Sequence, residues 1–495
     1  MANSDRIFDL IQSLNKGERR NLRIMVNREG TQNSPFFRLL DELYRLEKFD
    51  AVYLQKRLKC KPYVVQRGMK RLFEMVLMTR GHYQPERREV IGKKIADIRY
   101  LIAKRKNELA LGLAEAVQAS CTEEERFTEL ITVLELKIDL LQAWPDRREK
   151  AIEAMLHARQ NQLDLDRLTQ LRYRIDQIQP LSQNKNFSLQ IQTALNDPLL
   201  QASFSSERAR YRVDELKWQL QSKAGQYELA LHSIRRMVNR LSAHAPQFED
   251  FPTRFIDAQF TIARLHLGLG HRIAANLALQ RVIALPLEDE TLVARRFGEY
   301  CRMQFVLALE FGDAEVGLTA ANLFENNLAT YQFAFSPGQV QRLIYLATAV
   351  YIFSGQYRKA DRLLARRPPK ISAADPLRKY ALFNRLLEVL IAIRDHDAER
   401  ALQLRKAVRR QLTVLPEEHG QQLANFIVEA GKNITTDPLD NRKEWLRKYR
   451  AEVTQIPEPE LSTLPFHQFL EAQIQGETVM NCIRSNGFTS ANRTG

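Results

Sequence analysis

Apolar residues recur along this chain every three or four positions, which is the spacing of one face of an α-helix. Over positions 1–85 the spacing is interrupted often and predicts a series of short helices. Ser34-Pro35 and Asp50 are typical helix starts, because a Ser or Asp side chain accepts hydrogen bonds from the first backbone N–H groups. Proline also fits the first helical position. The stripe Ile91, Ile95 and Ile98 then predicts one charged connecting helix over 86–120.

From residue 121 onward the pattern changes to pairs of helices joined by short turns, and the pairs repeat. The turns fall at Asp146, Asn186, Gly225, Gly270, Gly312, Gly355 and His396, so successive residue numbers differ by 40, 39, 45, 42, 43 and 41. Five positions after each turn come Ala151, Ile191, Ala230, Ala275, Gly317, Ala360 and Ala401. Six of these seven are small, so the second helix of each hairpin can lie close to the first. A fixed period with a fixed small residue is typical of stacked helical hairpins.

Two of the turns share a longer motif, Gly-x-Tyr-x-x-Ala, at 225–230 and 355–360. It resembles the tetratricopeptide repeat, in which Gly makes the turn, Tyr packs on the next helix and Ala lies in the contact. The period here is longer than the usual ~34 residues. The expected structural residues of the turns are therefore Gly225, Tyr227, Ala230, Gly270, Ala275, Gly312, Gly355, Tyr357 and Ala360.

These patterns predict an all-α protein: a right-handed TPR-like α-solenoid of helical hairpins preceded by a small basic helical domain. Its expected parts are a basic helical domain over 1–85, the connecting helix 86–120, hairpin repeats over 121–430, a C-terminal helix over 431–455 and a mostly flexible tail over 456–495. Only 19 Gly and 18 Pro in 495 residues agree with a helical chain.

The positive charge of the chain is concentrated near its start. Residues 1–110 hold 25 Lys and Arg against 13 Asp and Glu, whereas residues 111–495 hold 49 against 46. This asymmetry indicates either an anionic partner for the first segment or a solvated basic face on a small domain.

The sharpest candidate in that segment is a helical hairpin over 50–80. Val65, Met69, Leu72 and Val76 form the expected buried stripe of its second helix. The hairpin could be a helix-turn-helix with its second helix in a DNA groove, or two ordinary packed helices with basic exteriors, which are commoner. The candidate nucleic-acid contacts are Lys56, Arg57, Lys59, Lys61, Arg67, Lys70 and Arg71.

No motif predicts catalysis, a cofactor or a metal. His266 and His271 are five positions apart and do not share a helix face, and no His or Cys spacing matches a zinc site. Gly268-x-Gly270 follows an expected helix rather than a strand, so a dinucleotide loop is rejected. The aromatic segment Tyr331–Phe335 is either an exposed anchor for a partner or a plug between repeats.

The chain begins without a basic and apolar leader, and it has no apolar stretch of about 18 residues. Its four cysteines, Cys60, Cys121, Cys301 and Cys482, are scattered and are typical of reduced thiols. We therefore expect a cytoplasmic protein with no membrane partner.

The segment Ser13-Leu-Asn-Lys-Gly-Glu-Arg-Arg20, followed by SPFFRLLDELYRLEKFD at 34–50 and a basic helix near residue 70, resembles the start of a family of uncharacterised bacterial cytoplasmic TPR-like proteins. The resemblance covers approximately positions 1–85 and, by architecture, the repeats. It implies the helical-repeat fold and no activity or ligand.

A solenoid of hairpins exposes an extended concave surface lined by the first helix of each hairpin, which suits the binding of a peptide or another protein. The expected function is a non-enzymatic scaffold or adaptor that binds a protein or peptide on its repeats. The alternative is a nucleic-acid-binding regulator with the basic hairpin at about 50–80 as its reader and the repeats as its partner domain.

Overall fold

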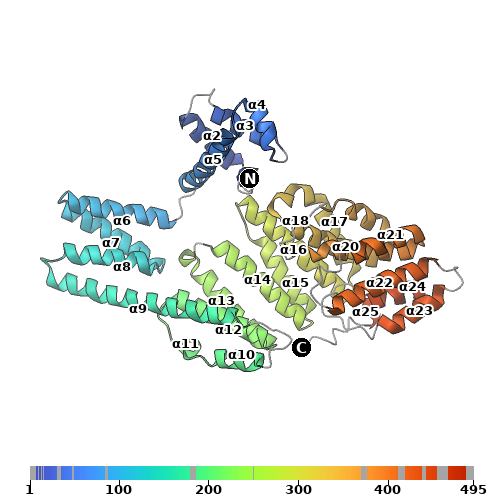
Figure 1. Cartoon of the computed structure of the whole chain (residues 1–495). Coiled ribbons are helices and arrows are strands. Elements are labelled where there is room, and N and C mark those ends of the chain that lie inside the picture. The colour runs from blue at the N-terminus through green and yellow to red at the C-terminus, as the bar shows by residue number, and fades with distance from the viewer. Residues whose placement is uncertain are drawn as a thin grey trace. The chain divides into compact units, whose positions relative to one another are not determined.

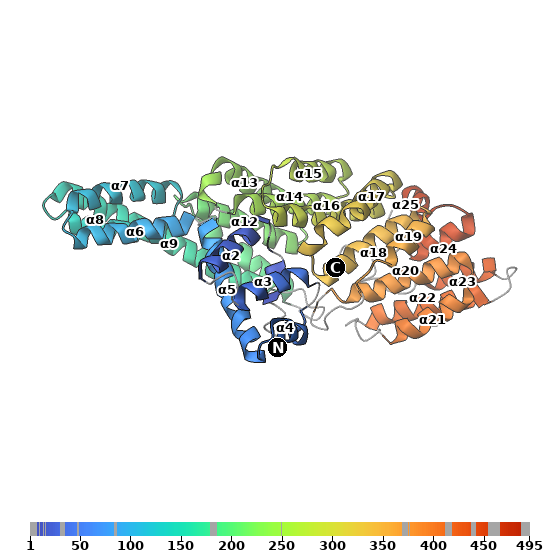
Figure 2. The same ribbon diagram turned by 90° about the horizontal axis from the view of Figure 1, so that it is seen from above.

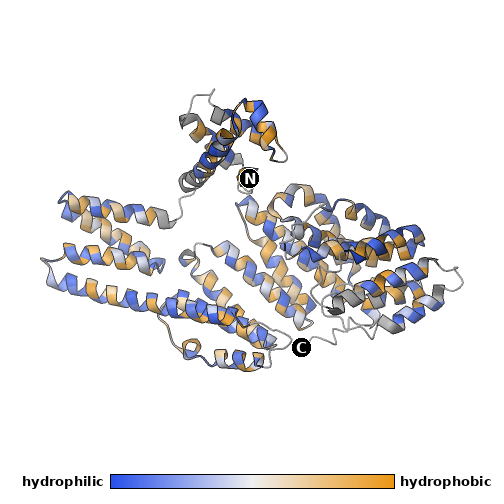
Figure 3. Ribbon diagram, viewed as in Figure 1, coloured by the Kyte–Doolittle hydropathy of each residue, from blue (hydrophilic) through white to orange (hydrophobic). Residues whose placement is uncertain are grey.

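The computed structural model describes residues 7–8, 10–12, 14, 16–29, 35–46, 49–83, 87–178, 186–248, 250–368, 375, 377–410, 418–436, 442–453 and 466–486. Every regular element in these ranges is a helix, so the predicted all-α class is confirmed (Figure 1). Hydrophobic residues recur as separate patches along the helices, with hydrophilic residues between them (Figure 3). None of the described helices is long and apolar enough to cross a membrane.

The chain forms two compact units, residues 1–220 with 236–251 and residues 221–235 with 252–495. The helices up to the end of the first unit are α2 Lys16–Glu29, α3 Pro35–Arg45, α4 Ala51–Leu58, α5 Pro62–Tyr83, α6 Arg87–Ala103, α7 Asn107–Glu123, α8 Phe127–Leu140, α9 Pro145–Asp176, α10 Phe187–Leu195, α11 Pro198–Gln201, α12 Glu207–Lys223, α13 Tyr227–Ala243 and the 3₁₀ turn η1 Ala245–Gln247.

The second unit continues the chain in the same way. Its helices are α14 Phe251–Gly268, α15 Arg272–Ala284, α16 Glu290–Phe311, α17 Ala314–Tyr331, the 3₁₀ turn η2 Gln332–Ala334, α18 Pro337–Phe353, α19 Tyr357–Leu364, α20 Lys379–Asp395, α21 Ala398–Arg409, α22 Glu418–Thr436, α23 Arg442–Val453, α24 Phe466–Gln475 and α25 Val479–Asn486 (Figure 2).

Helices α2 to α5 pack around a hydrophobic core of their own at the start of the chain. The predicted stripe of α5, Val65, Met69, Leu72 and Val76, is buried there together with Met75. Asp50 accepts a hydrogen bond from the backbone N–H of Tyr53 and so caps α4, as expected. The predicted hairpin is therefore present, and its turn contains Lys59 with a positive φ of 50°.

The single connecting helix expected over 86–120 is wrong. The chain instead forms two helices, α6 and α7, because it reverses at Lys104–Lys106. Arg105 has a φ of 58°, and the N–H of Lys106 bonds to the carbonyl of Leu101. This hydrogen bond and the left-handed residue together make a Schellman turn, which here is formed without glycine.

In the second unit, the predicted turn residues do lie between the two helices of each hairpin. Gly270, Gly312, Gly355 and His396 have φ values of 74°, 63°, 79° and 57°. Gly225, between α12 and α13, has a φ of 72°. Glycine adopts a positive φ without the steric cost that a Cβ atom causes in other residues. Asp146 and Asn186 differ, because Asp146 lies in the first turn of the long helix α9 and Asn186 directly precedes α10.

The small residues after the turns are buried in the helix contacts. Ala230, Ala275 and Ala360 are fully buried. A Cβ atom at Gly317 would approach the Cβ of Ala308 on α16 to 2.8 Å, so the glycine lets α17 lie against the first helix of its hairpin. Tyr227 packs its ring against Gly268 of α14, as the motif predicts.

The mostly flexible tail expected over 456–495 is also wrong in its central part. Residues 466–486 form the helices α24 and α25, whose apolar side chains join the core of the second unit. Phe469, Met480 and Cys482 are fully buried there. Arg484 of α25 donates a hydrogen bond to the carbonyl of Gly312 at 3.3 Å. The expected C-terminal helix over 431–455 corresponds to α23, and positions 487–495 lie outside the described ranges.

Candidate ligand-binding surfaces

A hollow of about 390 Å³ lies on the first helices of three successive hairpins, α14, α16 and α18. We call it the arginine hollow. Its lining includes four arginines and two carboxylates: Arg264, Arg295, Arg296, Arg342, Asp257 and Glu299. A cavity of this size holds a small ligand or one or two side chains of a partner. It is the best candidate for a binding site in the repeats.

The local sequence explains how the hollow forms between α16 and the loop before α18. Gly298 carries no side chain, and a Cβ there would meet the ring of Phe335 at 2.5 Å. Phe335 therefore packs onto α16 and closes part of the floor, which supports the plug interpretation for this end of the aromatic segment. Phe333, two positions earlier, is 49% exposed. The capping box of Ser336 and Gln339 then starts α18 beside the hollow.

The arginines of the hollow have fewer carboxylates than they need for pairing. Arg302, on the same helix as Glu299, donates to that carboxylate at 2.8 Å, and a guanidinium nitrogen of Arg342 lies 3.9 Å from it. Arg264 donates to the hydroxyl of Thr261 at 2.9 Å. Arg296 donates to the carbonyl oxygens at the end of α15, including Val282 at 3.2 Å.

This crowding changes the proton affinities of the groups around the hollow. Partial burial lowers the pKa of Arg264 and of Arg342, and the positive charge of Arg302 lowers both further. Partial burial also raises the pKa of Asp257, although the nearby arginines oppose that shift. A guanidinium keeps its charge at neutral pH in spite of such shifts, so an anion entering the hollow would relieve repulsion among like charges.

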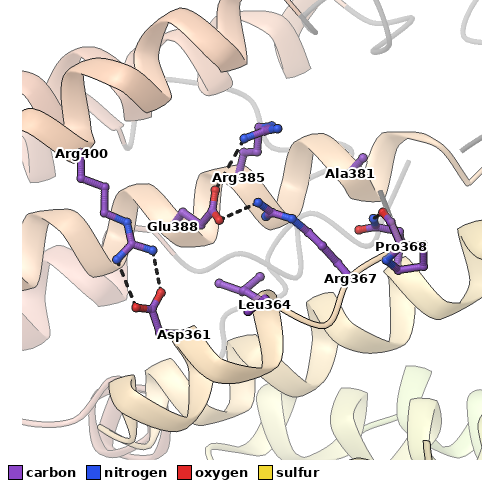
Figure 4. A pocket seen from close by; sticks show the side chains of 10 residues that line it. Asp361, Leu364, Arg367, Pro368, Ala381, Arg385, Glu388 and Arg400 are labelled. Carbon is purple, nitrogen blue, oxygen red and sulfur yellow. Dashed lines mark hydrogen bonds and ion pairs between the residues drawn. The ribbon is translucent and has the colours of Figure 1, made fainter. Parts of the chain in front are cut away.

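A second hollow, of about 590 Å³, lies among α18, α19, α20 and α21 (Figure 4). Its arginines are already paired. Arg400 meets Asp361 with two hydrogen bonds of 2.6 and 3.3 Å. Arg367 and Arg385 both point to Glu388, at 2.8 and 3.8 Å. Because each charge here has an internal partner, we interpret this hollow as an ion-pair network that ties neighbouring hairpins together.

All seven predicted nucleic-acid contacts lie on the surface of α4, α5 and the turn between them, and all are exposed. Arg57 is 3.4 Å from Glu42, and Arg71 is 3.0 Å from Glu74. The other five basic residues make no ion pair with any described residue. Tyr63, Arg67 and Lys70 follow one another at spacings of four and three along α5, so they share a face. Tyr63 is 61% exposed on it.

One serine and one histidine meet on the surface of the first unit. The hydroxyl of Ser205 lies 3.4 Å from Nε2 of His157 and donates to the amide oxygen of Asn161 at 2.7 Å. The hydroxyl proton thus points to an amide instead of the imidazole, and both Ser205 and His157 are exposed. This geometry lacks the carboxylate and the sheltered nucleophile of a hydrolase site.

The described residues contain no group of three or more His, Cys, Asp or Glu side chains that could hold a metal ion. The rings of His266 and His271 are 5.7 Å apart, but His266 is buried and lies 3.1 Å from Arg235. Burial and the charge of Arg235 both lower the pKa of His266. A neighbouring guanidinium disfavours a cation at this place.

Sequence reasoning did not find the arginine hollow. Its residues come from three helices that are not consecutive in the chain, and the near-balance of charge over 111–495 conceals a local excess of arginine. The available signal was the adjacent pair Arg295 and Arg296 on one expected first helix.

No family model matches this chain, and the comparisons found neither a curated protein nor a solved structure that is similar to it.

Proposed function

We propose that this protein is a non-enzymatic scaffold or adaptor of the cytoplasm that binds a segment of another protein on its helical hairpins. The observation that supports the proposal is the arginine hollow, which lies on α14, α16 and α18. First helices of successive hairpins are the elements that line the binding surface of helical-repeat proteins. A side chain or short helix of a partner is the kind of ligand that fits such a surface.

The proposal includes a right-handed, TPR-like arrangement of the hairpins and membership of the TPR-like family that positions 1–85 resemble. The shared Gly-x-Tyr-x-x-Ala motif supports it. Tyr227 lies against the following helix α14, and Tyr357 stacks with Arg394 of α20, whose guanidinium carbon is 4.7 Å from the ring centre. Both tyrosines thus contact the first helix of the next hairpin, as the repeat requires.

Site-specific cross-linking tests the proposed surface. A photo-crosslinking amino acid replaces Leu292, which lines the hollow, or Ile273 on α15, which is 79% exposed and belongs to a second helix. We expect Leu292 to capture one recurring protein segment from an extract of the producing cells and Ile273 to capture none. Equal capture at both positions, or none at Leu292, would refute the scaffold proposal for this surface.

A second function, binding of nucleic acid by the basic domain over 1–85, is favoured by one specific observation. Lys56, Lys59, Lys61, Arg67 and Lys70 are exposed and have no ion pair in the described part of the chain. Exposed cations without partners release counterions from a phosphate backbone when they bind it, and the affinity then falls steeply with salt. The exposed ring of Tyr63 beside them could stack on a base or a sugar.

Full-length protein and a labelled DNA duplex test this second function by fluorescence anisotropy at several salt concentrations. Replacement of Arg67, Lys70 and Arg71 by Glu should weaken binding at low salt by about a hundredfold or more. The slope of log affinity against log salt concentration should become shallower by roughly three, one for each lost phosphate contact. The matched control reverses Lys104, Arg105 and Lys106, which are equally exposed in the α6–α7 turn. Equal losses in both variants would indicate a general effect of net charge.

A further inference from the structure

The arginine hollow combines an apolar floor with a cationic rim. Its floor is apolar, since Ile256, Phe260 and Leu343 are buried beneath it. Its rim is cationic, since Arg264 and Arg295 make no ion pair with any residue in the described ranges. A ligand must therefore offer an apolar group to the floor and negative charge to the rim.

The clearest pointer to a ligand is Arg342. The Nε atom of its side chain is buried and has no hydrogen-bond partner among the described residues. A buried donor without a partner loses its bonds to water and gains none in return. The only described carboxylate that pairs with the Arg342 guanidinium is Glu299. That carboxylate lies closer to Arg302. A ligand acceptor in the hollow could pair with the partly exposed guanidinium of Arg342 without disturbing the Glu299–Arg302 pair.

The carboxylates of the hollow limit the kind of anion that fits. Asp257 and Glu299 line the same space as the arginines. A doubly charged phosphate would be repelled by both more strongly than a singly charged group. A carboxylate carries a single charge, pairs with a guanidinium through two parallel hydrogen bonds, and leaves the neighbouring side chain free to enter the floor.

We propose that the arginine hollow binds a protein segment in which Asp or Glu stands next to an apolar side chain, with the acid at Arg264 and Arg342 and the apolar group over Phe260 and Leu343. This inference rests on the proposed scaffold function and specifies its partner. The rim arginines determine which segments bind, and the floor supplies the apolar contact area.

Model peptides test the chemistry directly on the full-length protein. The probe is a fluorescein-labelled peptide of alternating Glu and Leu, compared with versions that carry Gln for Glu, Ser for Leu, or phosphoserine for Glu. We expect the Glu–Leu peptide to bind at least tenfold more tightly than the Gln–Leu and Glu–Ser peptides, and more tightly than the phosphoserine peptide. Its affinity should fall as salt is added.

Variants connect the binding to the hollow. Arg264→Gln with Arg342→Gln should weaken the Glu–Leu peptide about tenfold and leave the weak Gln–Leu peptide unchanged. Arg281→Gln is the control, because Arg281 is an exposed arginine of α15 outside the hollow. An unchanged melting temperature in each variant shows that a loss of affinity is not a loss of fold.

The outcomes separate this inference from the proposal on which it rests. If the Leu292 cross-linker captures a segment that has no acid, or captures one while Glu and Gln peptides bind equally, the carboxylate chemistry is wrong and the scaffold function stands. If the phosphoserine peptide binds best, the ligand is a phosphorylated segment and the inference falls. If Leu292 captures nothing and no peptide binds, both proposals fall.

Discussion

Among single residues, Arg105 and Glu125 adopt left-handed backbone without being glycine, with φ values of 58° and 49°. Each ends a helix of the first unit by a Schellman turn. They differ in what the side chain does. The side chain of Arg105 is exposed, whereas the carboxylate of Glu125 accepts hydrogen bonds from Ser206 Oγ at 2.7 Å and from the N–H groups of Glu207 and Arg208 at 2.8 Å. Glu125 thus caps the start of α12 from a distant turn.

This difference predicts unequal effects when each residue is replaced by glycine. Arg105→Gly removes a left-handed strain of about 1 kcal/mol and adds unfolded-state entropy of similar size, so its stability should change by less than about 1 kcal/mol. Glu125→Gly also loses charge-assisted hydrogen bonds worth about 1.5–3 kcal/mol each, so it should destabilise by roughly 2 kcal/mol or more. Urea unfolding gives both values.

Hydrogen exchange at the amides of Glu207 and Arg208 supplies the local check. Exchange there should quicken in Glu125→Gly and stay unchanged in Arg105→Gly. If Glu125→Gly leaves these amides protected, the carboxylate is not what caps α12.

The residues predicted correctly from the sequence are those with a local marker. Glycine marks Gly270 and Gly355, and apolar spacing marks Met69 and Leu72. Arg105 and Glu125 have no such marker, because any residue can occupy a left-handed turn at a modest cost. The arginine hollow could not be predicted because its charge balance depends on which helices become neighbours.

For the helices as elements, the turn at Gly312 differs from the otherwise similar turn at Gly270. Both glycines have a positive φ. Nothing lies within 4 Å of a Cβ built on Gly270, whereas a Cβ on Gly312 would stand 2.5 Å from the carbonyl oxygen of Met480 and 2.8 Å from the backbone nitrogen of Arg484. The backbone of α25 therefore lies directly on the α16–α17 turn.

Gly312→Ala should accordingly cost more than Gly270→Ala. In the Gly270 variant, alanine must adopt a positive φ, which should lower the free energy of unfolding by about 1 kcal/mol. The Gly312 variant adds a backbone clash that displaces α25, so we expect a total loss of about 2–4 kcal/mol. Thermal unfolding measures the stability of the two variants. Equal losses of stability would show that α25 can move away from the turn without destabilising the protein.

The division into elements was predictable wherever the chain used glycine, proline or a capping side chain. The connecting helix was misjudged because Lys104–Lys106 are good helix formers whose reversal is set by the packing of α6 on α7. The tail was misjudged because a short helix such as α25 has little local preference and gains its stability from the core it covers.

For the chain as a whole, the core of the second unit needs α24 and α25, which come late in the sequence. A chain that ends at residue 455 lacks both helices, and the side chains that Phe469 and Met480 cover would meet water. We expect the second unit of this truncated chain to melt at a lower temperature and to bind a hydrophobic dye. Phe469→Ala in the full chain should cause a milder form of the same defect. We expect it to lower the free energy of unfolding by about 3–5 kcal/mol.

The control for that experiment is Leu277→Ala on α15, which changes a side chain that is 58% exposed. It should shift stability by no more than about 0.5 kcal/mol. Melting of the truncated chain at the temperature of the intact protein would mean that α24 and α25 cover the core without stabilising it.

The contact of Arg484 with Gly312 spans 172 residues of sequence. A ribosome that adds about 5–20 residues per second needs roughly 10–35 s to make the intervening chain. Throughout that interval the surface that α25 will cover faces solvent. Folding of the second unit is therefore completed only after α25 has been made.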